Sequence, residues 1–207
     1  MGVIHFWIGY SIQNSFTSID GGEQVTAVIL FWLMLFSLFD NRINHWHHSK
    51  SESKTGDAVG WAILLIVKLQ ISYLYLNSTV TKLKNKEWID GTAVYYYLND
   101  SLYGLSNWLY DILSIFIETP VIALVTWSTL IIQLTLAGSI FANQDFKNFI
   151  FIIALLMHEI FALFMGLVSF SLIMLSVLII YLKPINIKSE ALYEKNNISS
   201  DCANIVS

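Results

Sequence analysis

The chain has 207 residues, of which 56% are hydrophobic and only 13% are charged, and its mean hydropathy is +0.61. About a quarter of the residues of an ordinary soluble domain are charged, so this chain has too little polar surface to coat a soluble core. The composition excludes a soluble globular enzyme, a disordered tail and a nucleic-acid binder. We therefore expect a multi-pass protein of the cell membrane, with the lipid bilayer as one partner and nucleic acid not among its partners.

Long apolar stretches predict membrane-crossing helices in an all-α, polytopic bundle. The stretches are residues 24–39, 58–80, 120–142 and 148–182. The last is too long for one upright crossing of a hydrocarbon core of roughly 30 Å, so we expect a break or a tilt near Gly166. Thr119 followed by Pro120 predicts an N-cap and a proline at the first helical position. We expect one transmembrane domain over residues 1–187 and a polar, disordered tail over 188–207.

Two further segments are apolar but do not predict spans. Residues 1–12 meet polar residues too soon to cross, and they resemble the end of a longer element. In residues 91–117, large apolar residues recur at steps of four and three, which places them in one stripe on a helix. The polar residues and tyrosines between them predict one or two helices in the headgroup layer, interrupted at Gly104. Lysine and arginine are nearly balanced between the loops, so the orientation stays open.

Polar side chains at membrane depth are costly, and each is a candidate functional residue unless it only joins two helices. Gln70, Tyr73, Asn77 and Thr81 are three or four residues apart, so they share one face of the second span. Lys82 ends this polar stripe, and its amine is a candidate general base. The alternative interpretation of Lys82 is a snorkelling lysine within a basic triplet.

His158 and Glu159 interrupt the last apolar stretch. They do not form the zinc-protease helix motif, because Ala162 stands where the second histidine should be. His158 is either a buried histidine bonded to a neighbouring helix or a group that handles protons or binds a ligand. Three more histidines share one loop: His45, His47 and His48. No fourth ligand is evident beside them, so we expect an interfacial loop and no metal site.

Several strings together resemble a known family. The most specific are QISYLYLNS at residues 70–78, Lys82–Leu83, Glu87–Trp88 and GTAVYYY at residues 91–97. Flanking strings agree with it: HFW at residues 5–7, DGGEQ at residues 20–24, Asp40, Arg42, Trp46, His158, Gly166, Leu167, Phe170, Ser171 and Met174. On these residues the chain resembles the SdpB family, the membrane component of the sporulation-delaying type of antimicrobial peptide system. The resemblance covers nearly the whole chain up to Tyr181.

The resemblance implies a multi-span bacterial membrane protein that acts on an exported toxin precursor with a soluble or membrane-associated partner. Family members normally carry hydrophobic spans ahead of residues 5–7, so we expect those N-terminal spans to be missing here. The family is in turn distantly similar to the transmembrane (HTTM) domain of vitamin K-dependent gamma-carboxylases. Their Lys-Leu, followed shortly by Trp and Gly, matches Lys82, Leu83, Trp88 and Gly91.

Three functions are compatible with these observations, and whether the chain is an enzyme stays open. The first is a factor needed for maturation or export of a secreted peptide precursor. The second is a quinone-dependent, gamma-carboxylase-like membrane enzyme with Lys82 as the base. Its expected ligand-binding residues are Gln70, Tyr73, Asn77, Trp88 and His158. The third is a membrane immunity protein that sequesters the toxin.

Overall fold

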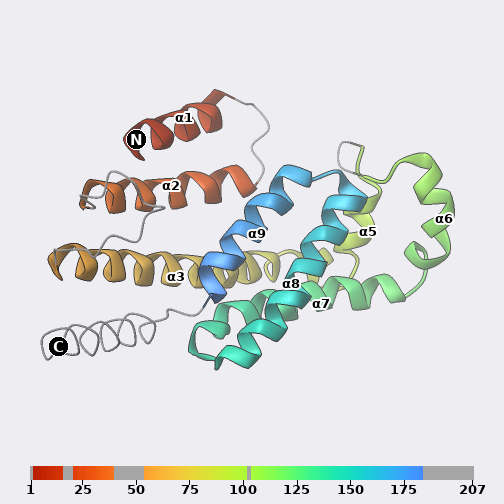
Figure 1. Cartoon of the computed structure of the whole chain (residues 1–207). Coiled ribbons are helices and arrows are strands. Elements are labelled where there is room, and N and C mark those ends of the chain that lie inside the picture. Colours follow the sequence, from red (N-terminus) through yellow and green to blue (C-terminus); the bar gives the residue numbers. More distant parts are fainter. Residues whose placement is uncertain (1, 16–20, 40–53, 102–103, 184–207) are drawn as a thin grey trace, which may run out of the picture.

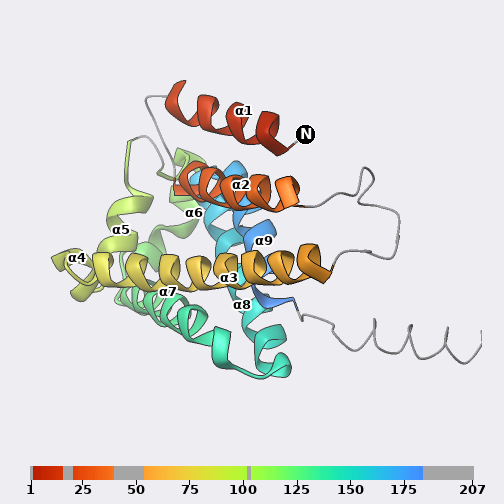
Figure 2. The ribbon, with the colours of Figure 1, turned by 90° about the vertical axis from the view of Figure 1, so that its left-hand side faces the viewer.

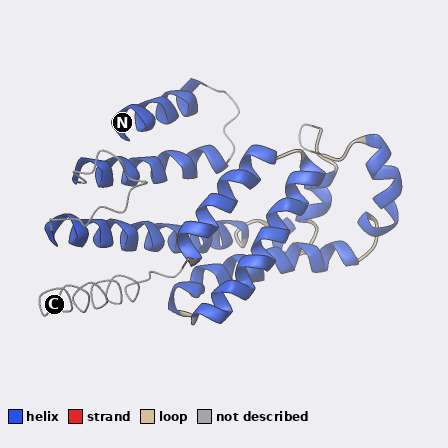
Figure 3. Cartoon of the chain, in the orientation of Figure 1, coloured by secondary structure: helices blue, strands red, loops and turns tan. Residues whose placement is uncertain are grey.

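The structure is a computed structural model, and it describes residues 2–15, 21–39, 54–101 and 104–183. Helices run through this part of the chain, and it contains no strand (Figures 1 and 3). This confirms the predicted all-α fold class. Several predicted features lie outside the described residues: the loop histidines at 45–48, Asp20 at the start of the DGGEQ string, Asp40, Arg42 and Trp46 of the family strings, and the tail 188–207.

The helices follow the predicted apolar stretches closely. In chain order they are α1 (Gly2–Ser15), α2 (Gly21–Phe39), α3 (Lys54–Lys82), α4 (Lys86–Ile89), α5 (Ala93–Leu98), α6 (Asn107–Ile117), α7 (Val121–Gly138), the 3-10 turn η1 (Ser139–Phe141), α8 (Gln144–Met165) and α9 (Val168–Leu182). Within the described ranges, α2, α3, α7 with η1, and α8 are long and apolar enough to cross a membrane. The described helices are thus compatible with insertion into a bilayer.

The long last apolar stretch breaks where it was predicted to break. Helix α8 ends at Met165, and α9 begins at Val168. Gly166 between them has φ 71°, in the left-handed region that glycine adopts at little cost. Asn143 caps the start of α8, because its Oδ1 accepts a hydrogen bond from the Phe146 N–H at 3.0 Å. The apolar stretch therefore forms two helices that fold back on each other.

The predicted cap at the start of α7 was wrong. Pro120 itself is the N-cap residue, and no side chain accepts a hydrogen bond from the first turn. The hydroxyl of Thr119 instead donates backward to the carbonyl of Phe116, at 2.8 Å. Threonine can satisfy its hydroxyl on the preceding turn as readily as it can cap the next one, and here the preceding helix α6 ends close by.

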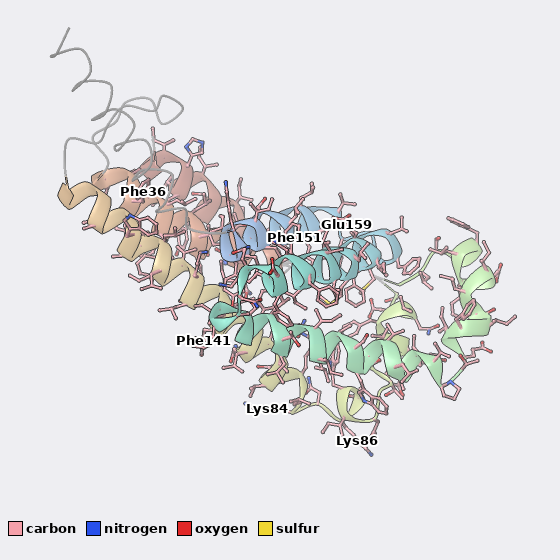
Figure 4. All side chains as sticks on the ribbon, turned by 60° about the horizontal axis from the view of Figure 1, so that its bottom comes forward. Phe36, Lys84, Lys86, Phe141, Phe151 and Glu159 are labelled. Carbon is pink, nitrogen blue, oxygen red and sulfur yellow. The ribbon has the colours of Figure 1, made fainter. Side chains whose placement is uncertain are left out.

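Helix α3 is the central element of the bundle. Helix α1 packs on α2, while α3 packs on α2, α7 and α9 (Figures 1 and 2). Phe36, labelled in Figure 4, is near the end of α2. It lies against Gly60 near the start of α3. The main core lies where these helices meet, with Ile71, Leu136 and Leu178 almost wholly buried.

Polar side chains also join the helices around α3. The Ser72 hydroxyl donates to the carbonyl of Ala137 on α7 at 2.6 Å. The amine of Lys68, on a side chain that is 7% exposed, donates to the carbonyl of Lys183 at the end of α9, 2.8 Å away. Such bonds hold helices together where water is absent. Lys68 is thus accounted for by helix packing.

Residues 91–117 form two helices separated at Gly104, as predicted. Val94 and Leu98 of α5 pack with Ile117 of α6 in a small separate core. Helix α6 leaves large apolar side chains uncovered, among them Trp108 at 66% exposure and Ile115 at 73%. Their position in the headgroup layer stays a prediction.

Candidate functional site

Five helices line an open cavity of about 510 Å³. Most of its lining is apolar, and we call it the polar cavity after the polar side chains along one wall. Its longest wall is the second half of α3, from Gln70 to Lys82. Helix α2 adds its first turns around Gln24, and α9 adds Phe170 and Met174. Single side chains come from α7 and α8, Gln133 and His158 respectively. The volume falls in the range of small-ligand sites, roughly 300–1,000 Å³.

The polar stripe predicted on α3 faces this cavity over most of its length. Gln70, Tyr73 and Asn77 line the cavity, whereas Thr81 does not. The side chains of Gln70 and Asn77 make no hydrogen bond within the described part of the chain. Helix-to-helix bonding therefore does not explain these two amides, and each is left with both donors and acceptors unused.

Lys82 lies at one end of the cavity wall and is held there by three contacts. Its Nζ donates to Ser78 Oγ at 2.6 Å and to Gln133 Oε1 at 3.2 Å. The same atom lies 5.3 Å from the centre of the Trp88 ring, which is within reach of a cation–π interaction. Lys84 is exposed on the turn after α3, and Lys86 is exposed at the start of α4 (Figure 4). These contacts position the Lys82 amine. The two interpretations of Lys82, a general base and a snorkelling lysine, stay predictions.

His158 and Tyr75 are buried in the cavity wall with their polar atoms unpartnered. His158 is 3% exposed and Tyr75 is 2% exposed. Neither ring nitrogen of His158 has a hydrogen-bond partner, and neither has the Tyr75 hydroxyl. The histidine ring lies in a T-shaped arrangement with the ring of Phe170, 5.6 Å away between centroids. Leaving such a group unsatisfied costs about 1–3 kcal/mol, so buried polar groups of native proteins rarely lack a hydrogen-bond partner.

The described residues that line the cavity include one lysine and no carboxylate. The lysine is Lys82. Glu159, next to His158, is exposed and accepts a hydrogen bond from the Ser171 hydroxyl at 2.7 Å. The cavity therefore offers one cation at one end and neutral hydrogen-bonding groups along the rest.

The structure brings most of the predicted site residues together. Gln70, Tyr73, Asn77, Lys82 and His158 all line the polar cavity. The remaining one, Trp88, is buried behind Lys82 and contacts its amine without lining the cavity. The roles assigned to these residues stay predictions.

Sequence reasoning missed several residues of this site, and three of them have polar groups that bear on its chemistry. Ser78 and Gln133 hold the amine of Lys82, and Tyr75 contributes an unpartnered hydroxyl. Gln133 carried a signal, because it is an amide within an otherwise apolar span. Tyr75 carried none, since an aromatic residue in a membrane helix is ordinary.

Comparison with known proteins gives two relatives from Bacillus subtilis (strain 168). The chain is 41% identical to the sporulation-delaying protein SdpB over 186 residues, which is 89% of this chain and 58% of that protein. It is 40% identical to the uncharacterized protein YitO over 187 residues, 89% of this chain and 60% of that protein. The chain thus spans about three fifths of the length of the curated relatives it matches.

These similarities confirm the predicted resemblance to SdpB. No protein-family model matches the chain, and no solved structure matches it. The likeness to the carboxylase transmembrane domain stays a prediction.

Proposed function

We propose, from the premise that this chain is a homologue of the sporulation-delaying protein SdpB, that it is the membrane component of a toxin system of that type. In this role it is needed for maturation or export of a secreted peptide precursor, together with a soluble or membrane-associated partner. The observation that carries the proposal is 41% identity over 89% of the chain. The helical bundle and its polar cavity support it, because polar residues within membrane helices often mark the pathway of a substrate.

A chimera tests the proposal directly. In Bacillus subtilis cells that lack their own SdpB, the matching segment of SdpB is replaced by this chain. We expect the chimera to restore secretion of active toxin, read as a killing zone on sensitive cells and as the mass of the secreted peptide. Accumulation of unprocessed precursor, with the chimera present in the membrane at the normal level, would contradict the proposal.

The same cells separate maturation from immunity. Cells that express the chain without the precursor are challenged with added mature toxin. Under the proposal they die as fast as cells carrying an empty vector. Survival of these cells, combined with no secretion by the chimera, would instead identify a protein that sequesters the toxin.

A second candidate is the carboxylase-like enzyme, and the setting of Lys82 favours it. The amine is fixed by Ser78 and Gln133 at the edge of a cavity, where a general base must be held. A reduced quinone fits the lining, because its hydroxyl groups match the unused amides of Gln70 and Asn77 and the unpartnered nitrogens of His158. When bound, the reduced quinone would supply, on oxidation by dioxygen, the base strength needed to remove the proton that carbon dioxide replaces. The chain's own residues would bind its oxygens and hold the amine of Lys82 near them.

Lysine variants of the chimera test this second candidate. Loss of a general base lowers a rate by about 100-fold or more, so Lys82→Ala should abolish modification of the peptide. The readout is the mass of the secreted peptide, with and without the added mass of one carbon dioxide. Lys84→Ala is the matched control, because that lysine is exposed and outside the cavity. Equal losses from both variants, or no mass difference at all, would refute catalysis by Lys82.

A further inference from the structure

Several side chains that line the polar cavity each carry both a hydrogen-bond donor and a hydrogen-bond acceptor. Gln70 and Asn77 make no hydrogen bond within the described part of the chain, and both nitrogens of His158 are unpartnered. Gln133 uses only its carbonyl oxygen, which accepts from Lys82 and Ser78. Carboxamides and neutral imidazole carry donor and acceptor side by side. A ligand that satisfies this wall must therefore present both kinds of group repeatedly along its length.

An extended peptide backbone presents that pattern. Every residue other than proline brings one N–H and one C=O, and inside a bilayer each of these must find a partner. An extended segment makes no hydrogen bonds within itself, so all its backbone groups stay available to the wall. Along α3, the distance from Gln70 to Lys82 is about 18 Å, the length of about five extended residues.

The apolar part of the wall suits the side chains of such a segment. Val25 and Ile29 on α2, Leu74 on α3 and Met174 on α9 line the same cavity as the amides. In an extended segment, successive side chains point to opposite sides, so apolar side chains can contact these residues while the backbone meets the amides. An acyl chain would bury its tail here as well, but it would leave the amides unpaired.

Lys82 sets the direction of the segment. It is the cation of the cavity wall, at one end, and no acidic side chain among the described lining residues opposes it. A carboxylate beside an ammonium group forms a charge-assisted hydrogen bond, about twice as strong as a neutral one. The carboxyl terminus of a peptide places one such charge at one end only, which matches the single cation.

We propose that the polar cavity binds an apolar peptide segment of about five residues in extended form, with its terminal carboxylate on Lys82. The inference rests on the proposed function in one respect: it names the class of substrate that a maturation or export factor would hold. It makes Gln70, Asn77 and His158 partners of the peptide backbone.

Photolabelling of the purified 207-residue chain in lipid nanodiscs tests this proposal. The probe is a pentapeptide of valine and leucine with a free carboxyl terminus and one photoreactive leucine. We expect labelling of α2, α3 and α9 residues that line the cavity, and competition by the same peptide without the label. A peptide with a methylated backbone lacks N–H donors and should compete about tenfold less well, the effect of about one hydrogen bond to a buried partner.

Matched variants assign the contacts. Asn77→Leu should weaken labelling about tenfold. Asn148→Leu changes an amide that is exposed like Asn77 but lies outside the cavity, where it accepts a hydrogen bond from Gln144, and it should leave labelling unchanged. The wild type should prefer the free acid over the carboxyl-terminal amide, and Lys82→Ala should lose that preference while Lys84→Ala keeps it. Each variant is first checked for unchanged helix content by circular dichroism.

The same assay distinguishes a peptide from other ligands of the cavity. Equal competition by the methylated peptide would overturn the proposal, because the probe would then only partition into an apolar space. Displacement by oleate or by a short-chain quinone at lower concentration than by the peptide would overturn it in favour of a lipid acid or a quinone. Secretion of active toxin by the chimera without any peptide labelling would refute this inference alone, whereas peptide labelling without secretion would refute the proposed function alone.

Discussion

Two buried tyrosines provide a matched test of the unpartnered groups in the polar cavity. Tyr75 is 2% exposed and Tyr181 is 1% exposed. The Tyr181 hydroxyl donates to the carbonyl of Leu136 at 2.8 Å, whereas the Tyr75 hydroxyl has no partner. Replacing either tyrosine by phenylalanine removes one oxygen atom and little else. The two substitutions should therefore change the free energy of unfolding in opposite directions.

The size of each effect follows from hydrogen-bond energetics. Tyr181→Phe loses a net hydrogen bond, worth about 1 kcal/mol, while the Leu136 carbonyl keeps the Ser139 hydroxyl as a donor at 2.7 Å. Tyr75→Phe removes an unsatisfied hydroxyl and should stabilise the folded state by about 1 kcal/mol. For a chain of this size 1 kcal/mol corresponds to about 2–4 °C, so the two melting temperatures should differ by about 4–8 °C.

Thermal unfolding in detergent, followed by circular dichroism, measures this difference. The wild type should melt between the two variants, with Tyr75→Phe above it and Tyr181→Phe below it. If Tyr75→Phe melts as low as Tyr181→Phe, the Tyr75 hydroxyl is bonded in the folded protein. Tyr75 would then offer no unsatisfied hydroxyl to a ligand in the cavity.

Three further predictions test other parts of the account. His158→Leu should raise stability by about 1–3 kcal/mol in the same melt and abolish photolabelling by the pentapeptide; a destabilised variant would show that the imidazole is bonded. Gly166→Ala should lower the free energy of unfolding by about 1–2 kcal/mol because φ is 71°, although no atom lies within 4 Å of the added methyl group. Gly138→Ala, at an uncrowded helical position, should instead raise it by up to about 1 kcal/mol. Ser72→Ala should lower the free energy of unfolding by about 1 kcal/mol, because it removes the hydrogen bond to α7. Ser176→Ala is the control and should be near neutral, because its hydroxyl bonds only within its own helix. Equal melting temperatures of the two variants would show that the α3–α7 hydrogen bond does not contribute to stability.

Much of the fold follows from local sequence signals. Helix positions could be predicted because apolar runs of this length have no alternative in a bilayer, where the backbone must bond within its own segment. The break at Gly166 was visible because glycine is the residue that enters the left-handed region without strain. The start of α7 was predicted wrongly because Thr119 had two acceptable places for its hydroxyl, and the choice between them depends on how close α6 ends.

The site could be predicted only where one helix carries it. Gln70, Tyr73 and Asn77 share a helical face, so their common orientation follows from spacing alone. That His158 on α8 meets the same cavity is a tertiary fact, which no spacing within one helix encodes. The contact of Lys82 with Gln133 likewise depends on how α7 lies against α3.

Site-specific crosslinking in cells tests the central claim, that the polar cavity holds the precursor peptide. A photoreactive residue replaces either Tyr73, which lines the cavity, or Leu134, which is 54% exposed on α7 and lies outside it. Each chimera is expressed with the precursor and irradiated. The account predicts a crosslink to the precursor from position 73 and none from position 134. Crosslinks from position 134 alone, or from neither position in cells that secrete active toxin, would contradict it.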